Sequence, residues 1–329
     1  ARRKQPELNI NQIDYNDQKV LDYIGTGKTD GVFQLESAGM KGFMKELKPH
    51  NLEDVIAGIS LYRPGPMDFI PQYIRGKNDS SSITYDCPQL EPILAPTYGC
   101  IVYQEQVMQI VRDLAGYSLG RSDLLRRAMS KKKAAVMEKE RKIFIYGDEE
   151  TGVPGCIKNG IDEQTANKIY DEMIDFAKYA FNKSHAAAYA VVSYQTAWLK
   201  YYFPVEYMAA LMTSVIDNPS KVSEYIYACR QMNIKILPPD INKGEANFSV
   251  DGGDIRYGLA AIKSIGRPVI KAIVEDREEL GLFQNLEDFI TRLSAKNILN
   301  KRTIENLIKA GALDTLGGTR KQGGMILGQ

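Results

Sequence analysis

The sequence predicts a mainly α-helical, multi-helical fold with short β-hairpins, followed by paired short helices near the C-terminus. Apolar residues recur at helical spacing from residue 101 onward, and Asn, Asp or Ser stands before several of these segments. Strand-like residues flank the Asp-Gly-Gly-Asp sequence of 251–254. The 329 residues are 44% hydrophobic and 25% charged, which is typical of a globular protein long enough for two domains.

Caps and prolines delimit the predicted helices in the first two thirds of the chain. Two prolines in 62–66 forbid continuation of the helix before them. Residues 32–37 could form a short strand or the entry to a helix. Helices are predicted over 38–47 and 51–60, and a further helix ends at Gly116. Three more begin at the N-caps Ser122, Asp162 and Ser184, and another begins at Pro219.

Shorter elements are expected after residue 234. Residues 234–242 are apolar and then broken by prolines. Two strands flank 251–254, and short helices with small turns follow, the first helical pair meeting at a tight turn of 264–266. The Gly-rich residues 318–329 are predicted to form a flexible tail.

Charge and cysteine content exclude several classes of protein. With 42 Lys and Arg against 41 Asp and Glu, the chain is neither a polycation nor an acidic disordered protein. Four scattered cysteines and two histidines favour neither a disulfide framework nor a zinc site, and they fit a reducing cytoplasm. Neither a membrane span nor a secretion signal is evident, and the first residues are typical of a chain cut from a longer one.

One strongly basic segment, residues 121–142, stands out in this neutral chain. It holds nine basic and only three acidic residues. On a helix Arg126 and Arg127 point about 100° apart, so that one can face a polyanion while the other braces it. The planar guanidinium binds two phosphate oxygens at once. We therefore expect Arg126, Arg127 and Lys131 to bind phosphate; the alternative is a solvated charged face.

A second candidate segment joins two predicted helices at residues 181–185. Helix N-termini present free N–H groups and partial positive charge, which suit an anion. Lys183 adds charge, while Asn182, Ser184 and His185 add directional hydrogen bonds. The alternative is an ordinary N-cap beside a surface histidine.

No catalytic centre is evident in the sequence. Neither His50 nor His185 has a serine or cysteine partner that periodicity places beside it, and no carboxylate pair has the spacing for two magnesium ions. Arg63 lies in a stiff turn and is counted among the expected nucleotide-binding residues, with a turn role as the alternative. Residues 103–109 begin a helix whose polar side chains have turn or core roles by default. We therefore predict no catalytic and no metal-ligating residue.

The C-terminal turn of 264–266 offers a separate anion site. Its exposed N–H groups, together with nearby basic side chains, could grip a backbone phosphate without reading bases. A helical hairpin without a ligand is the alternative. The predicted DNA-binding residues are Lys263, Ser264, Gly266, Arg267 and Lys271.

Six sequence blocks, in order, resemble one family. They closely resemble the α subunits of bacterial DNA polymerase III, which are C-family replicative polymerases, and the resemblance runs from about residue 13 to about residue 317. The blocks are DGVFQLES (30–37), ISLYRPGP (59–66), PTYGCIVYQEQVMQI (96–110), DLLRRAMSKKK (123–133), FNKSHAAAYAVVSYQTAWLK (181–200) and LPPDIN (237–242).

The resemblance implies a role for each part of the chain. Residues 1–255 correspond to the fingers domain, which meets the incoming nucleotide, and residues 256–317 to a tandem helix-hairpin-helix element that grips duplex DNA. Arg126 and Arg127 match the basic helix at the triphosphate, and Ser184 and His185 lie in the block beside the sugar. Ser264 departs from the family, which has glycine at this turn position, at some cost in backbone freedom.

The resemblance also implies what the chain acts with. The expected function is a share in DNA-directed DNA synthesis, with dNTP and primer-template DNA as ligands and no membrane contact. Magnesium would be held by palm aspartates outside this chain, so that the isolated fragment would be inactive. The remaining polymerase domains would be partners, and the sliding clamp and other replisome subunits would bind through regions outside this chain.

Two other interpretations remain open. The chain could be a non-enzymatic DNA-binding module that relies on its helical hairpins. A small-molecule phosphotransferase using the basic helix is the other, but the sequence lacks a GxxxxGK[ST] loop.

Overall fold

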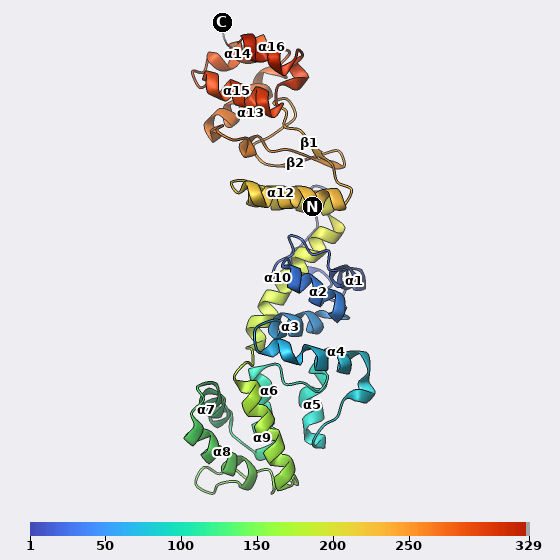
Figure 1. Ribbon diagram of the computed structural model, residues 1–329, viewed down its shortest axis with the longest axis vertical. Helices are drawn as coiled ribbons and strands as arrows, with labels where there is room; N and C mark the ends of the chain where they lie inside the picture. The colour runs from blue at the N-terminus through green and yellow to red at the C-terminus, as the bar shows by residue number, and fades with distance from the viewer. Residues whose placement is uncertain (327–329) are drawn as a thin grey trace. The chain divides into compact units, whose positions relative to one another are not determined.

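The computed structural model describes residues 1–326, and α-helices dominate it, as predicted (Figure 1). Strands in the described part of the chain are confined to one three-stranded sheet. The chain divides into two compact units. We call residues 12–197 the central unit, and residues 1–11 together with 198–329 the terminal unit.

The central unit has a large core among α6, α7, α8 and α9. Val107, Ile110 and Leu114 of α6 are buried at the spacing that predicted this helix, and Phe144 and Tyr170 face the same core. Helix α10 runs across the boundary of the two units. The helices are α1 (Gln18–Gly25), α2 (Ala38–Leu47), α3 (Leu52–Leu61), α4 (Ile70–Asn78), α5 (Glu91–Leu94), α6 (Gln104–Ala115), α7 (Leu119–Ser130), α8 (Ala134–Tyr146), α9 (Glu163–Ala177) and α10 (Lys183–Tyr202).

Two of the predicted N-caps are wrong. Ser118, not Ser122, caps α7, because the helix begins one turn earlier than predicted. Asn182, not Ser184, caps α10, since its side-chain oxygen accepts the backbone N–H of His185 at 2.9 Å. In both helices the predicted serine lies within the first turn. Residues 32–37 form turns rather than a strand.

The terminal unit contains the small sheet. Its strand order is β1-β3-β2, with β1 parallel and β2 antiparallel to β3. The predicted hairpin is confirmed: Asp251 pairs with Asp254, and Gly252 adopts the positive φ of 64° that a tight turn requires. Helix α11 packs on this sheet and on α12. The elements are α11 (Pro204–Ser214), α12 (Pro219–Gln231), β1 (Ile236–Leu237), β2 (Ser249–Asp251) and β3 (Asp254–Arg256).

Four short helices and a second core complete the terminal unit. Ile270, Phe289 and Leu307, one from each of three helices, are fully buried together. The helix predicted before the turn of 264–266 is only a 3-10 turn, Leu259–Ala261, because the backbone becomes extended at Ile262, with φ −72° and ψ 128°. The helices are α13 (Arg267–Leu280), α14 (Leu286–Ser294), α15 (Lys301–Ala310) and α16 (Arg320–Ile326).

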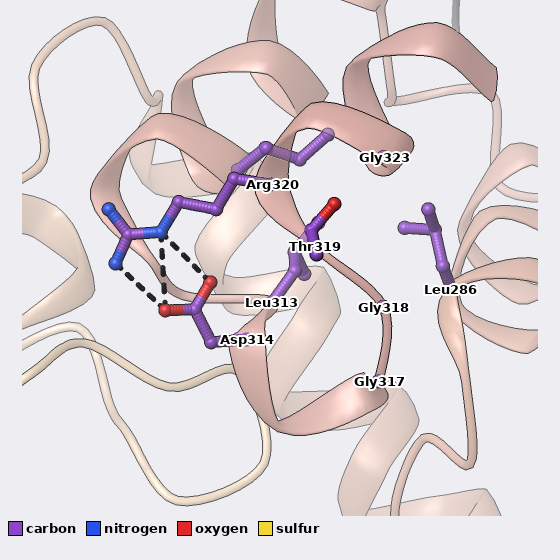
Figure 2. A pocket seen from close by; sticks show the side chains of 9 residues that line it. Leu286, Leu313, Asp314, Gly317, Gly318, Thr319, Arg320 and Gly323 are labelled. Carbon is purple, nitrogen blue, oxygen red and sulfur yellow. Dashed lines mark hydrogen bonds and ion pairs between the residues drawn. The ribbon is translucent and has the colours of Figure 1, made fainter.

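Within the segment predicted as a flexible tail, the structure has helix α16. Figure 2 shows Arg320 at its start paired with Asp314 across the Gly317–Gly318 turn. The Nη2 atom of Arg320 lies 2.8 Å from a carboxylate oxygen of Asp314. The cavity beside this pair holds only about 20 Å³, which is room for one water and not for a larger ligand. Residues 327–329 of the predicted tail lie outside the described residues.

Candidate functional site

Helix α7 displays the predicted cations because its other face is buried. Leu125 and Met129 pack into the core that α7 shares with α6, which directs the neighbouring arginines outward. The side chain of Arg126 is 20% exposed and that of Arg127 is 61% exposed. Lys131 follows at the C-cap and is exposed. Arg127 and Lys131 are therefore the accessible charges, and Arg126 is partly enclosed.

A single carboxylate holds both arginines. Asp123 accepts from Nη2 of Arg126 at 2.7 Å and pairs with Nη2 of Arg127 at 2.9 Å. The hydrogen bond from Arg126, opposed by slight desolvation and aided by both positive charges, lowers the pKa of the Asp123 carboxyl. Two guanidinium groups against one carboxylate leave this helix surface cationic. Asp123 thus orients the two forks and competes with any incoming anion for them.

The 181–185 segment is fixed to the start of α6. The backbone N–H of Phe181 donates to Val102 O at 3.1 Å, and that of Gln104 donates to Phe181 O at 3.0 Å. The carboxylate of Glu105 accepts the backbone N–H of Lys183 at 3.0 Å. Asn182, Ser184 and His185 are exposed, as their predicted role in binding requires. Glu105 therefore already occupies one of the N-terminal N–H groups of α10 that were predicted to bind an anion.

Lys183 and His185 make further contacts around the same turn. Lys183 Nζ lies 3.3 Å from a Glu53 carboxylate oxygen and 5.4 Å from the centre of the Tyr103 ring. The His185 ring meets that of Tyr189 edge-on at 4.4 Å. The ammonium group is thus partly neutralised, and the imidazole is oriented by an aromatic neighbour.

Arg63 reaches this segment from the turn after α3. Its guanidinium lies 4.6 Å above the centre of the Phe181 ring and donates to the carbonyls of Ser60 and Tyr179. Burial lowers the pKa of Arg63. A side chain at Gly65, which has φ +100°, would meet the Tyr179 ring at 2.7 Å, so the turn requires glycine. Arg63 therefore braces the segment.

The Gln104 side chain links α7 to Ala180, the residue before the 181–185 segment, and the Gln104 backbone N–H bonds to Phe181 within it. Gln104 Oε1 accepts from Nη1 of Arg126 at 3.2 Å, and Gln104 Nε2 donates to Ala180 O at 3.4 Å. Sequence reasoning gave residues 103–109 a core or turn role and did not select Gln104, Glu105 or Asp123. Gln104 and Glu105 could have been selected from the sequence, because they are polar residues at the start of a helix whose other face is buried.

The C-terminal turn keeps its predicted residues at the surface. Lys263, Ser264, Gly266, Arg267 and Lys271 are all exposed. Two of these cations have acidic neighbours, as Arg267 lies 4.0 Å from Asp217 and Lys271 lies 3.7 Å from Glu275. Beneath the turn, Ile265 and Ile270 are buried and anchor it to the core.

A second turn of similar form follows between α14 and α15. Asn297 adopts a φ of 55°, close to the 64° of Ser264, and each turn leads into a helix that begins with a basic residue. Arg302 of this second helix lies near the first turn, its Nη2 donating to Ser264 Oγ at 3.5 Å. Beside the first turn, Lys263 and Lys309 line a groove of about 470 Å³.

Within residues 1–326 we find neither a metal-binding cluster nor a membrane-spanning helix. Within residues 1–326, His, Cys, Asp and Glu side chains form no group of three or more suited to a metal ion. No helix in the described part of the chain combines the length and apolar character needed to cross a membrane.

Two regions of the chain match known family models, one of a polymerase domain and one of a structural motif. Residues 1–152 match the family model described as the bacterial DNA polymerase III alpha subunit finger domain. Residues 233–323 match a helix-hairpin-helix motif, which takes in both turns described above.

The particular protein that the chain resembles is the DNA polymerase III subunit alpha. The chain is 48% identical over 316 residues to that of Thermus aquaticus, covering 94% of this chain and 25% of the relative. It is 47% identical over 325 residues to that of Escherichia coli K12 and 44% identical over 314 residues to that of Bacillus subtilis 168, covering 96% and 95% of this chain and 27% of each relative. The resemblance stated from the sequence is confirmed, and the chain spans about a quarter of the length of these relatives.

Proposed function

We propose that this chain supplies the nucleotide-facing and duplex-gripping part of a DNA-directed DNA polymerase that acts in DNA replication. The observation that carries the proposal is that Gln104 bonds through its side chain to Arg126 and Ala180 and through its backbone N–H to Phe181, which brings the α7 cations next to the 181–185 segment. The 48% identity to a polymerase subunit supports the reaction class. In that reaction the primer 3′-hydroxyl attacks the α-phosphate of a dNTP and pyrophosphate leaves.

The triphosphate is bound by the α7 cations in this proposal. Arg127 and Lys131 are exposed enough to meet it first, and Arg126 stabilises the charge from a more enclosed position. Asp123 already orients both guanidinium forks, which reduces the ordering needed when the nucleotide arrives. The contribution to catalysis is electrostatic stabilisation and positioning of the leaving phosphates.

The sugar and base lie against the start of α10 in the same proposal. Ser184 and His185 are exposed on its first turn, and Asn182 caps it. Arg63 and Lys183 act indirectly, by holding the segment in place, because the Arg63 side chain already contacts Phe181 and that of Lys183 contacts Glu53. Ala188 is exposed and Ala187 partly exposed, and these small side chains let a ligand approach this helix closely, whereas Ala186 is buried.

Duplex DNA is gripped by the C-terminal turns. Lys263, Ser264, Gly266, Arg267 and Lys271 present cations and turn N–H groups to the backbone phosphates without reading bases. In this proposal residues 1–255 form the fingers domain and residues 256–317 form the tandem helix-hairpin-helix element.

The complete polymerase would supply what these residues do not. Magnesium fits no cluster of the described residues, so its ligands would belong to other domains, and no step proposed here passes through it. Those domains, the sliding clamp and other replisome subunits are the proposed partners, and the proposed location is the cytoplasm.

Replacement of the α7 arginines tests the nucleotide site. In the full-length polymerase, Arg126→Ala with Arg127→Ala should raise the KM for all four dNTPs at least tenfold and lower kcat, since the change removes two charge-assisted hydrogen-bonding groups from the triphosphate. The matched control is Lys139→Ala with Lys142→Ala, which removes two exposed cations from α8. Unchanged KM and kcat in the arginine variant would remove the triphosphate assignment.

The helix-hairpin-helix match also favours a second function, that of a DNA-binding module without nucleotide affinity. Removal of residues 256–317 from the full-length protein distinguishes the two. The module predicts that DNA binding disappears with these residues and that dNTP binding is absent whether or not they are present. The polymerase proposal predicts that dNTP binding survives the deletion.

A further inference from the structure

We propose that Gln104 and Glu105, the first two residues of α6, are positioning residues that set where Arg126 and the first turn of α10 lie against the bound nucleotide. This inference rests on the proposed function. Both side chains act through other groups, so neither is expected to touch the nucleotide.

Gln104 has the chemistry that its two contacts demand. Arginine can only donate hydrogen bonds, and a backbone carbonyl can only accept them. A side chain that meets Arg126 Nη1 at 3.2 Å and Ala180 O at 3.4 Å must therefore offer one acceptor and one donor, as an amide does. A carboxylate in this place would keep the bond to Arg126 but face the Ala180 carbonyl with a like partial charge.

Glu105 needs only an acceptor. Its two carboxylate oxygens lie 3.0 and 3.3 Å from the backbone nitrogen of Lys183, the first residue of α10. The negative charge is also favourable at a helix N-terminus. With Asn182 accepting the N–H of His185, this contact fixes the turn that carries Ser184 and His185.

The backbone keeps the two segments together when either side chain is replaced. The pair of backbone hydrogen bonds between residues 102–104 and Phe181 does not involve the side chains of residues 104 and 105. Glu105 is exposed, and Gln104 is only partly buried. The variants should therefore fold, and a change in nucleotide kinetics would report position and not a loss of structure.

A purely electrostatic role for Glu105 is the alternative, and two substitutions distinguish it from positioning. If its charge simply repelled the triphosphate, both Glu105→Ala and Glu105→Gln would lower the KM for dNTP. If it positions α10, Glu105→Gln retains the acceptor and behaves as the parent, whereas Glu105→Ala does not. Rescue by the conservative variant separates these two roles.

The test uses the full-length polymerase at saturating primer-template. Gln104→Ala, Gln104→Glu and Glu105→Ala should each raise the KM for dNTP about tenfold, the order expected when one hydrogen bond to a charged group or helix end is removed, with a smaller fall in kcat. Glu105→Gln should stay within about twofold of the parent. The control is Gln109→Ala, which removes an amide from the same helix. Among the described residues this amide bonds only to Asp113, at 2.6 Å.

Three results would overturn the inference. They are an unchanged KM in Gln104→Ala and Glu105→Ala, full activity in Gln104→Glu, and a lower KM in both Glu105 variants. The double arginine variant belongs in the same assay. If it raises the KM while the Gln104 and Glu105 variants do not, only this inference fails. If the arginine variant also has no effect, the proposed nucleotide site itself is wrong.

Discussion

Asp54 is a buried carboxylate in the central unit. It is 1% exposed, and its carboxylate accepts from Tyr73 at 3.0 Å, Tyr98 at 3.2 Å and the backbone of His50 at 2.8 Å, while Lys77 lies 3.8 Å away. Burial of a carboxylate is tolerated only with such partners. Burial, and then the Asp54 charge and hydrogen bond, raise the pKa of Tyr98 to about 12.

Alkaline pH should therefore weaken the fold through Tyr98. Because its pKa is raised in the folded protein above the ordinary value of 10.0, its stabilisation is complete below pH 10 and disappears as the pH rises toward 12. In Tyr98→Phe the slope of unfolding free energy against pH should be smaller by about 1.4 kcal/mol per pH unit in this window. Urea unfolding followed by circular dichroism measures it, with exposed Tyr227→Phe as control. Equal slopes for Tyr98→Phe and the parent would contradict the assignment.

At the scale of elements, the first helix-hairpin-helix turn contains a residue under backbone strain. Ser264 has a φ of 64°, which costs a non-glycine residue about 1 kcal/mol. Gly266, by contrast, has a φ of −73°, and a Cβ there would meet only Pro268, at 3.6 Å. The glycine that this turn's backbone favours is therefore missing at residue 264.

We expect Ser264→Gly to raise the melting temperature, since it removes this strain and gives up only the weak 3.5 Å contact with Arg302. The expected gain is at most about 1 kcal/mol, because glycine also gains entropy in the unfolded chain. Gly266→Ala should leave stability unchanged, and it serves as the control for thermal unfolding. A Ser264→Gly protein that melts below the parent would show that the hydroxyl contact matters more than the backbone.

Elements were more predictable than the contacts between them. Helix α2 begins after Ser37 and ends at Leu47, as the local sequence indicates, since one cap and one apolar stripe suffice to define it. For α7 and α10 the predicted serine lies inside the first turn, and Ser118 and Asn182 are the caps, because all four side chains are of types that can cap a helix and the local sequence does not distinguish them. Charge and resemblance select Arg126, Arg127 and the 181–185 segment as candidates. Gln104 and Glu105 are not selected in this way, because only the folded chain brings their partners together.

At the scale of the whole chain, the proposed nucleotide residues all belong to the central unit and the proposed DNA residues to the terminal unit. Sites in separate compact units should contribute independently to binding. The two groups of residues should thus be separable by mutation in the full-length polymerase, although both act in one reaction.

Lys263→Ala with Arg267→Ala should weaken duplex binding and reduce the slope of log affinity against log salt by about 2, roughly one for each phosphate that is no longer neutralised. At saturating DNA the KM for dNTP should stay at the parent value, since the α7 cations are untouched. Arg126→Ala with Arg127→Ala should do the reverse, leaving the salt slope of binary DNA binding unchanged.

Fluorescence anisotropy over a salt series and steady-state primer extension measure the two quantities. Lys235→Ala with Lys243→Ala, two exposed cations of the same unit, is the matched control. If the Lys263 and Arg267 variant keeps the parent slope, the duplex is held by another surface, because a protein cannot neutralise fewer phosphates without changing the number of counterions that binding releases.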